Sequence, residues 1–203
     1  GSGHRVAHNT LVGSTDPADG GGACFQRVEG STCDDDGDCP ANARCYCGEL
    51  SKLGNCATPP GPPIWPADTP GQCYRPARCG LDKAVQVNGG ESVIEHNRID
   101  LIGQPVHVDA GTHTIADNLT CGSRTSLNTC QAYDVSGGLA TFARNRIDHC
   151  KFGIRVTNAG RADAVDNVLT NGWISAFQVR GDGGGRLRAA GNLLRRHGFA
   201  TTS

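Results

Sequence analysis

The stretch N145-R-I147 returns along the second half of the chain as N97-R-I99, N167-V-L169 and N192-L-L194, with a weaker member at N118-L-T120. In each copy an asparagine is followed two residues later by a residue that is aliphatic in all but the weaker member. Subtracting successive asparagine positions gives intervals of 21, 27, 22 and 25 residues. A period of about 20 to 25 residues is typical of a solenoid, in which each repeat forms one turn of a stacked coil.

A second pattern precedes each asparagine and predicts β-strands. The triplets that place an outward residue between two inward ones are V85-Q-V87, V106-H-V108, Y133-D-V135, I154-R-V156 and F177-Q-V179. Each is followed by a turn of small residues and by an inward residue three positions before the asparagine: Ile94, Ile115, Phe142, Ala164 and Ala189. Such alternation is typical of strands with one buried face. Short strands with Gly, Asn or Asp at the corners predict an all-β parallel β-helix of about six rungs.

This pattern resembles the right-handed parallel β-helix repeat family, the architecture of pectate-lyase-like enzymes and many surface proteins. The resemblance covers residues 84–203 and residues 4–13. It implies the fold, but it leaves the function open because one fold supports many functions.

Stacking of the turns predicts columns of equivalent residues, since each strand lies about 4.8 Å from its equivalent in the next turn. Two inward columns read Ile99, Thr120, Ile147, Leu169, Leu194 and Val87, Val108, Val135, Val156, Val179. Each buried aliphatic residue contributes about 1.5–3 kcal/mol, but only where a neighbouring turn covers it. We expect the asparagines to be structural, because Asn tolerates the left-handed conformation of a tight corner and stacked amides hydrogen-bond between turns.

The two ends of the sequence look like halves of one turn. Val6 lies three residues before Asn9 and Leu11 two residues after it, as in the internal repeats. Joining the last residue to the first puts Asn192 and Asn9 20 residues apart (203 − 192 + 9), close to the internal period. Head-to-tail contacts of this kind do not close and generate filaments. The residues expected at such an end-to-end interface are Val6, Asn9, Leu11, Asn192, Leu194 and Phe199.

Residues 14–83 are expected to form a disulfide-rich insertion between a first half-turn at 1–13 and the β-helix at 84–203. Eight cysteines lie in this segment: Cys24, Cys33, Cys39, Cys45, Cys47, Cys56, Cys73 and Cys79. Eight cysteines allow 105 pairings, so the sequence leaves the connectivity open. The run resembles small cysteine-rich modules of secreted proteins, without the adjacent cysteine pair of the whey acidic proteins, so no firm family follows.

Three further cysteines lie among the turns. Cys121 and Cys130 bracket the longest interval, of 27 residues, and are expected to join across its extra loop. Cys150 occupies the position of Ile102 in the parallel repeat, so we expect a buried free thiol there. Eleven cysteines indicate an oxidising compartment, and an extracellular or cell-surface location is expected.

Composition excludes some partners. A net charge of −1 gives no electrostatic argument for nucleic acid or for an anionic membrane surface. No run of about 18 apolar residues is present, so no membrane span is expected. Asp34, Asp36 and Asp38 alternate as calcium ligands can, although the loop length and final Glu of an EF-hand are missing. Calcium is the only cofactor considered, and a solvated acidic turn is its alternative.

A possible catalytic group lies on an outward column that reads Gln86, His107, Asp134, Arg155 and Gln178. The resemblance to pectate-lyase-like enzymes implies a site in which Asp134 orients His107 as a base and Arg155 neutralises an acidic sugar. The alternative is a surface charge ladder that fixes strand register. Asp100 and Asp148, two turns and about 10 Å apart, could form a glycosidase pair. A local salt link within N-R-I-D is the simpler interpretation.

Taken together, the sequence predicts an extracellular structural or adhesive solenoid unit. Its partner is a second copy stacked head to tail, or adjoining turns of a longer chain. The alternative is a carbohydrate-active enzyme or carbohydrate-binding β-helix with an extracellular polysaccharide as partner. Whether the protein is an enzyme is not decided by the sequence.

Overall fold

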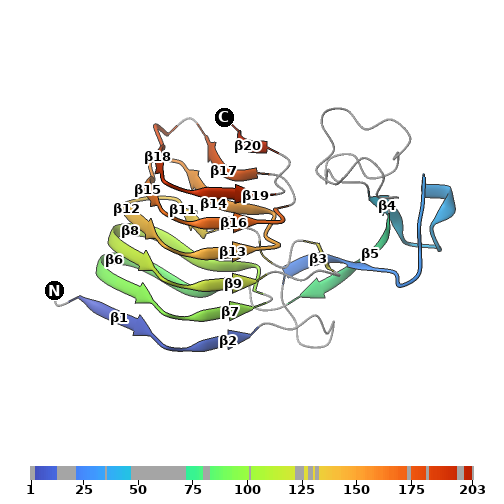
Figure 1. The fold of residues 1–203 in the computed structure, drawn as a ribbon, viewed down its shortest axis with the longest axis horizontal. Coiled ribbons are helices and arrows are strands. Elements are labelled where there is room, and N and C mark those ends of the chain that lie inside the picture. The colour runs from blue at the N-terminus through green and yellow to red at the C-terminus, as the bar shows by residue number, and fades with distance from the viewer. Residues whose placement is uncertain are drawn as a thin grey trace.

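The structure is a computed structural model. It describes residues 3–12, 22–34, 36–46, 72–79, 83–100, 102–121, 126–127, 130, 133–172, 175–181, 183–195 and 199–202. Two parallel sheets and one antiparallel sheet contain most of these residues (Figure 1). The described chain is therefore all-β, and its parallel sheets form a β-solenoid of about four turns.

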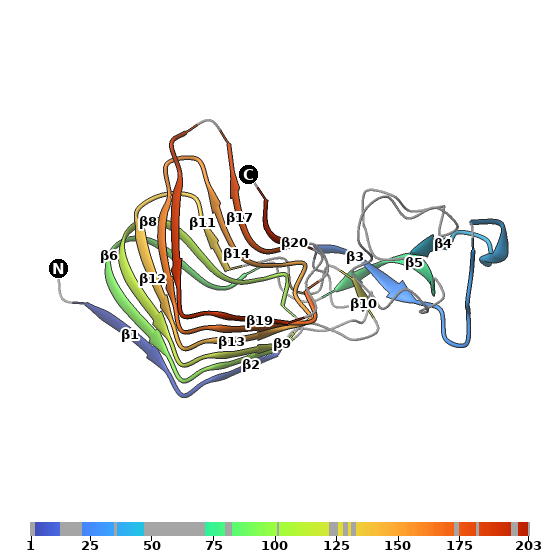
Figure 2. The ribbon, with the colours of Figure 1, turned by 45° about the horizontal axis from the view of Figure 1, so that its top comes forward.

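The larger parallel sheet has ten strands and supplies two walls of the solenoid. Its members are β1 (His4–Ala7), β6 (Lys83–Glu95), β8 (Gln104–Ala116), β11 (Tyr133–Val135), β12 (Leu139–Ala143), β14 (Phe152–Thr157), β15 (Arg161–Val165), β17 (Ser175–Arg180), β18 (Arg186–Ala190) and β20 (Phe199–Thr202). β6 and β8 are long because each runs through a corner and contributes to both walls (Figure 2).

The second parallel sheet has six strands, each of which begins directly after one of the repeated asparagines. They are β2 (Thr10–Val12), β7 (Arg98–Asp100), β9 (Leu119–Cys121), β13 (Arg146–Asp148), β16 (Val168–Thr170) and β19 (Leu193–Arg195). Their central residues pair in register as the predicted column Leu11, Ile99, Thr120, Ile147, Leu169, Leu194. The structure supports about four turns and not about six rungs, because counting asparagines also counts the partial turns at both ends.

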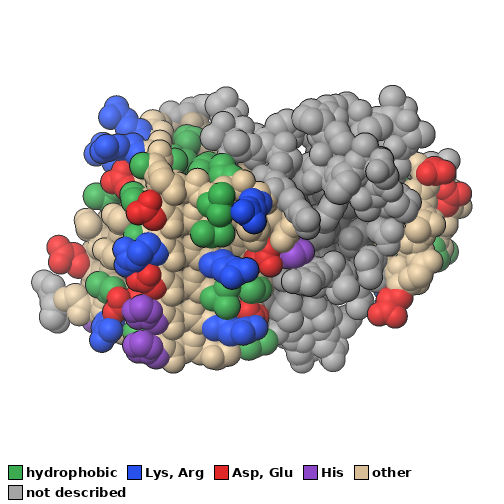
Figure 3. All heavy atoms as spheres, viewed as in Figure 1, with side chains coloured by type: hydrophobic (Ala, Val, Ile, Leu, Met, Phe, Trp, Pro, Cys, Tyr) green, Lys and Arg blue, Asp and Glu red, His purple; other side chains and the backbone are tan. Residues whose placement is uncertain are grey.

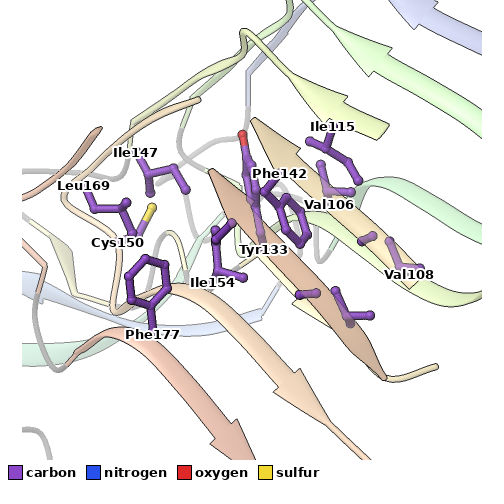
Figure 4. Close-up of a cluster of buried hydrophobic side chains, with 14 of the residues drawn as sticks. Val106, Val108, Ile115, Tyr133, Phe142, Ile147, Cys150, Ile154, Leu169 and Phe177 are labelled. Carbon is purple, nitrogen blue, oxygen red and sulfur yellow. The ribbon is translucent and has the colours of Figure 1, made fainter. Parts of the chain in front are cut away.

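The core lies between these walls and contains the predicted inward columns (Figure 4). Ile115 and Phe142 come from one wall, Val108 and Val135 from another, and all four are fully buried. Thr120 interrupts the aliphatic column, and its hydroxyl is within hydrogen-bond distance of the Tyr133 hydroxyl, at 2.5 Å. Burial raises the pKa of Tyr133, so the phenol stays neutral and able to donate.

A separate antiparallel sheet lies to one side of the solenoid (Figure 2). It consists of β3 (Gly22–Arg27), β4 (Arg44–Tyr46), β5 (Gln72–Cys79) and β10 (Ser126–Leu127), and a short 3-10 helix, η2 (Asp36–Asp38), precedes β4. β10 comes from the loop of the 27-residue interval and pairs with β3. That interval is long because its loop adds a strand to the cysteine-rich segment. The predicted boundaries at 13/14 and 83/84 stay predictions, since 13–21 and 80–82 lie outside the described residues.

Three disulfides join described cysteines: Cys33–Cys45, Cys39–Cys73 and Cys130–Cys150. The predicted Cys121–Cys130 bond is therefore wrong, and so is the predicted free thiol at Cys150. Cys150 is buried as expected, but Cys130 returns from the loop beside it, and the Lys151 backbone N–H donates to the Cys130 carbonyl. Cys121 follows the inward Thr120, faces outward and is a free thiol. The disulfides indicate an oxidising compartment.

Disulfide bonds at the four remaining cysteines of the insertion stay a prediction. The side chains of Cys24 and Cys79, and all of Cys47 and Cys56, lie outside the described residues. Within the described part of the chain, no helix has the length and apolar character that a membrane crossing requires.

The left-handed corner lies one residue before each asparagine, which corrects the expectation that Asn itself adopts this conformation. The positive φ angles belong to His8 (59°), His96 (54°), Asp117 (56°), Arg144 (53°), Asp166 (55°) and Gly191 (67°). The asparagine that follows turns its side chain inward, where the amide is buried in every internal turn. The corner and the amide ladder are thus made by two adjacent positions.

Candidate functional site

The predicted outward column forms as expected on the wall made by β8, β11 and β14. His107 pairs in register with Asp134, and Asp134 pairs with Arg155. Parallel pairing places their side chains on one face of the sheet at the strand spacing of about 4.8 Å. The structure therefore brings the three candidate residues together.

Asp134 and Arg155 form a two-point ion pair. Nε of Arg155 donates to Oδ1 of Asp134 at 3.0 Å, and Nη2 donates to Oδ2 at 3.1 Å. The guanidinium carbon also lies 5.7 Å from the centre of the Phe152 ring. Asp134 is 4% exposed. A buried carboxylate held at both oxygens is well suited to a structural role, because its charge is already compensated.

His107 has both ring nitrogens directed at carboxylates. Nε2 lies 2.7 Å from Oδ1 of Asp109 in a hydrogen bond. Nδ1 is buried and lies 3.2 Å from Oδ2 of Asp134, and it has no hydrogen-bond partner among the described residues. A general base must reach the proton that it removes. Nδ1 of His107 faces the interior of the cluster, and this geometry does not favour a base role.

Asp109 is the member of this cluster that the sequence interpretation missed. Its carboxylate accepts hydrogen bonds from Gln86 at 2.6 Å, from Ser136 at 2.9 Å and from His107 at 2.7 Å. These bonds, that from Gln86 foremost, lower the pKa of Asp109 to about 2 against the opposing effect of desolvation. A signal was present in V106-H-V-D109, because residues two apart on a strand share a face. With Asp109 included, the column becomes a connected network of hydrogen bonds and one arginine–aspartate ion pair.

The second pair of candidate carboxylates, Asp100 and Asp148, is separated by Cys121 in the same outward column. Asp100 accepts from Nε of Arg98 at 2.5 Å, so the local salt link in N-R-I-D is present. Asp148 accepts from Thr170 and Asn171, each at 2.7 Å. Burial opposes these bonds, yet they hold the pKa of Asp148 below its ordinary value. The pKa of Asp148 is therefore shifted away from that of the protonated acid that glycoside hydrolysis needs.

Metal ligands do not converge in the described part of the insertion. Oδ2 of Asp38 accepts the backbone N–H of Asp34 at 2.8 Å, and the side chain of Asp36 lies outside the described residues. Among the described residues, one close group of possible ligand atoms is formed by Cys33, Cys39 and Cys45. All three sulfurs are in disulfides, so they are not thiolate ligands. Calcium at Asp34, Asp36 and Asp38 stays a prediction.

The repeated asparagines form a continuous hydrogen-bonded ladder made of Asn9, Asn97, Asn118, Asn145, Asn167 and Asn192. At each step the backbone N–H donates to Oδ1 of the next asparagine, at 2.9–3.1 Å. The side-chain Nδ2 donates to the same oxygen, at 2.9–3.1 Å. From the second asparagine on, Nδ2 also donates to a carbonyl of the preceding turn, at 2.8–2.9 Å. The hydrogen bonds to Oδ1 all run in one direction along the stack, from each asparagine to the next.

The two ends of this ladder differ in hydrogen-bonding character. Among the described residues, Oδ1 of Asn9 accepts no hydrogen bond, and the backbone N–H of Asn192 has no acceptor. One end of the stack therefore presents an acceptor and the other a donor. In the interior, every asparagine supplies both.

Unpaired strand edges lie at the same two ends. The N-terminal end face consists of β1, β2 and residues 83–87 of β6, each with a described partner strand on one side only. The C-terminal end face consists of β18, β19 and β20, again with one described neighbour each. Figure 1 places these faces at opposite ends of the stack. Such edges can pair with further strands.

The expected interface residues lie at these faces. Val6 and Leu11 on one face, and Leu194 on the other, pack against the core but remain partly exposed. Asn9 and Asn192 are the terminal members of the asparagine ladder. The backbone of Phe199 lies in β20, whereas its side chain lies outside the described residues. The structure thus brings the described members of the set to two separate end faces, as an interface between copies requires.

No family model matches this chain, and no match is found among curated proteins or solved structures.

Proposed function

We propose that this protein is an extracellular structural unit whose two end faces pair with each other in successive copies, so that solenoids stack head to tail. The observation that carries the proposal is the complementarity of the end faces in strand position, hydrogen-bond polarity and apolar columns. We also infer that the coil is right-handed, because crossovers between parallel strands of one sheet are right-handed in about 98% of cases. It would then be similar to the right-handed β-helix family in fold, without a catalytic role.

The two end faces are uneven in complementary ways, because different strands extend furthest at each end. At the C-terminal end face, β20 extends one level beyond β18 and β19, since it pairs with β17 of the last full turn. At the N-terminal end face, β1 and β2 extend one level beyond residues 83–87 of β6. A second copy placed on the stack therefore seats β1 on β18 and β2 on β19. The same placement seats residues 83–87 on β20.

This seating continues the hydrogen bonds of the interior. The N–H of Asn192 in one copy would donate to Oδ1 of Asn9 in the next, as Asn167 donates to Asn192 within a copy at 2.9 Å. The register of the columns also places Leu11 over Leu194 and Val6 over Ala189. Burial of these half-exposed residues supplies the hydrophobic part of the contact.

One juxtaposition opposes the contact. The outward column puts Arg5 of the next copy over Arg188. Each arginine already has an acid on its own copy: Nη2 of Arg5 lies 2.6 Å from Glu95, and Nε of Arg188 lies 3.8 Å from Asp163. Both arginines are exposed, so solvent and salt screen the repulsion. The contact is expected to tighten as ionic strength rises.

Two single substitutions test the proposal. Leu11→Asp buries a charge at one end face and Leu194→Asp at the other, so each leaves one face intact. In sedimentation velocity, the wild type is expected to form a concentration-dependent series of oligomers, and each variant alone to remain a monomer. An equimolar mixture of the two variants should form dimers and nothing larger. That last result is specific to head-to-tail stacking.

Leu139→Asp is the matched control, because Leu139 is an exposed residue in the middle of the stack. It should assemble as the wild type does. A monomeric wild type at all concentrations, or a Leu11→Asp variant that still forms long oligomers, contradicts the proposal. Circular dichroism of each variant checks that the solenoid itself is folded.

A further inference from the structure

We propose that His8 of the next copy lies over Gly191, and that Asp166, whose carboxylate reaches over this glycine, forms an ion pair with that histidine. This inference rests on the head-to-tail stacking proposed above and identifies the charged contact that fixes and regulates it. The partner is a second copy of this chain.

The contact lies on the left-handed corner column. The residues of this column, in stacking order, are His8, His96, Asp117, Arg144, Asp166 and Gly191. Figure 3 shows histidine, acidic and basic side chains in a line along this edge of the stack. Within the copy, neighbouring charges are already matched: Arg144 donates to Asp117 at 2.8 and 2.6 Å. The column continues the same way across a junction, with His8 of the next copy above Gly191.

Glycine at 191 leaves the space that Asp166 uses. A Cβ atom built on Gly191 would lie 2.0 Å from Oδ1 of Asp166 and 3.2 Å from its Cγ. The Asp166 carboxylate therefore occupies the position of the missing side chain and reaches toward the C-terminal end face. The φ of Gly191, +67°, is left-handed like those of the five other corner residues, which lie between 53° and 59° and all carry side chains. The absence of a side chain, with the Asp166 carboxylate in its place, therefore distinguishes this position from the rest of the column.

His8 presents the complementary group on the other face. Its ring stacks on that of His96, with centroids 5.2 Å apart and planes 8° apart. The opposite face of the His8 ring points away from its own copy, toward the position of the neighbour. Asp166 and the incoming His8 are two strand levels apart, about 10 Å between backbones. A carboxylate that leans over Gly191 and an imidazole together span that distance.

The carboxylates near His8 in its own copy already have basic partners, which leaves His8 available to a carboxylate of the neighbouring copy. Glu95 is engaged with Arg5 at 2.6 Å and lies 4.0 Å from Nε2 of His96. Asp117 is paired with Arg144. Among the described residues, no carboxylate lies within ion-pair distance of His8. When both stacked rings are protonated they repel each other, and the neighbour's Asp166 would offset that repulsion.

The sign of the pH dependence follows. A histidine that gains an anionic partner only in the assembled state binds its proton more tightly there. Assembly is therefore favoured below the ordinary titration range of histidine, near pH 6.5, and is weakened as the pH rises through that range. An exposed ion pair changes the association constant roughly two- to fivefold.

The test is the association constant of the 203-residue protein at pH 5.5 and pH 8, measured by sedimentation equilibrium at fixed ionic strength. The wild type should associate roughly two- to fivefold more tightly at pH 5.5. His8→Gln and Asp166→Asn should each remove this difference, and the double variant should show no further change. Gly191→Ala should reduce the pH difference, because the added Cβ displaces the Asp166 carboxylate.

Two control variants isolate the contact. His4→Gln and His96→Gln remove the other histidines near the N-terminal end face and should keep most of the pH difference. An unchanged pH difference in His8→Gln and Asp166→Asn overturns this inference while assembly itself stands. Absence of assembly at both pH values overturns the stacking proposal on which it rests. If only His4→Gln loses the pH difference in the association constant, His4 and not His8 is its source, and the inference is overturned.

Discussion

The middle of the solenoid and its two ends use the same residue pattern with different results. Leu169 is fully buried, whereas Leu194, the next residue of its column, is only partly buried. Ala164 has no exposed surface, and Ala189 on the adjacent strand is exposed. Asn145 hydrogen-bonds in both directions, while Asn9 lacks one of them. A position in a solenoid is stabilising only to the extent that a neighbouring turn covers it.

The largest expected difference between middle and end is in the aliphatic column. Leu169→Ala should lower the free energy of unfolding by about 2–5 kcal/mol, because it leaves a cavity in a fully buried site. Leu194→Ala removes the same atoms from a partly exposed site and should cost less than half as much. Guanidinium unfolding at a concentration where the protein is monomeric measures both. Equal losses of unfolding free energy in the two variants would contradict the expected difference between the middle and the end of the stack.

The asparagine ladder should show the next largest difference. Asn145→Ala leaves the buried backbone N–H of Asn118 without its acceptor, which costs about 1–3 kcal/mol. Asn9→Ala removes a side chain whose Oδ1 accepts no hydrogen bond from the described residues, so its cost should be under about 1 kcal/mol. Asp is a useful second substitution at 145, since it keeps the acceptor and loses the donor. Urea titrations of the three variants would rank these effects, and a costlier Asn9→Ala would contradict the ladder's open end.

The smallest expected effect concerns Asp109, on the outer face of the stack. Its folded pKa of about 2 lies below the ordinary value of 3.8. The stabilisation is therefore present above pH 3.8 and is lost as the pH falls toward 2. Between pH 5 and pH 2 the melting temperature of the wild type should fall by up to about 2–4 °C more than that of Asp109→Asn. Parallel curves for the two proteins would show that the network around His107 contributes nothing.

The fold was predictable because its signal is repeated. The pairing of Ile99, Ile147 and Leu169 follows from the spacing of the asparagine motif, which recurs several times in the sequence. The ladder of amides was predictable for the same reason. The left-handed residue was placed one position too late, because the asparagine repeats in every turn, whereas the residue before it varies among His, Asp, Arg and Gly.

Features that occur once were harder to predict. The Cys130–Cys150 bond depends on where a single loop returns, and that loop is directed outward because β10 pairs with β3. Sequence spacing alone favoured the shorter link from Cys121. The outward trio was found by register, but the role of Asp109 depends on hydrogen bonds from Gln86 and Ser136 on adjacent turns. Such hydrogen bonds distinguish a catalytic base from a structural ladder of side chains, and they are visible only in the three-dimensional structure.

The pairing of β10 with β3 anchors the cysteine-rich sheet to one particular turn. If copies stack as proposed, each adds six levels of the second sheet, or about 29 Å along the axis. The cysteine-rich sheet then recurs along the stack at that axial repeat. Fibre diffraction would record it as a meridional series distinct from the strand spacing.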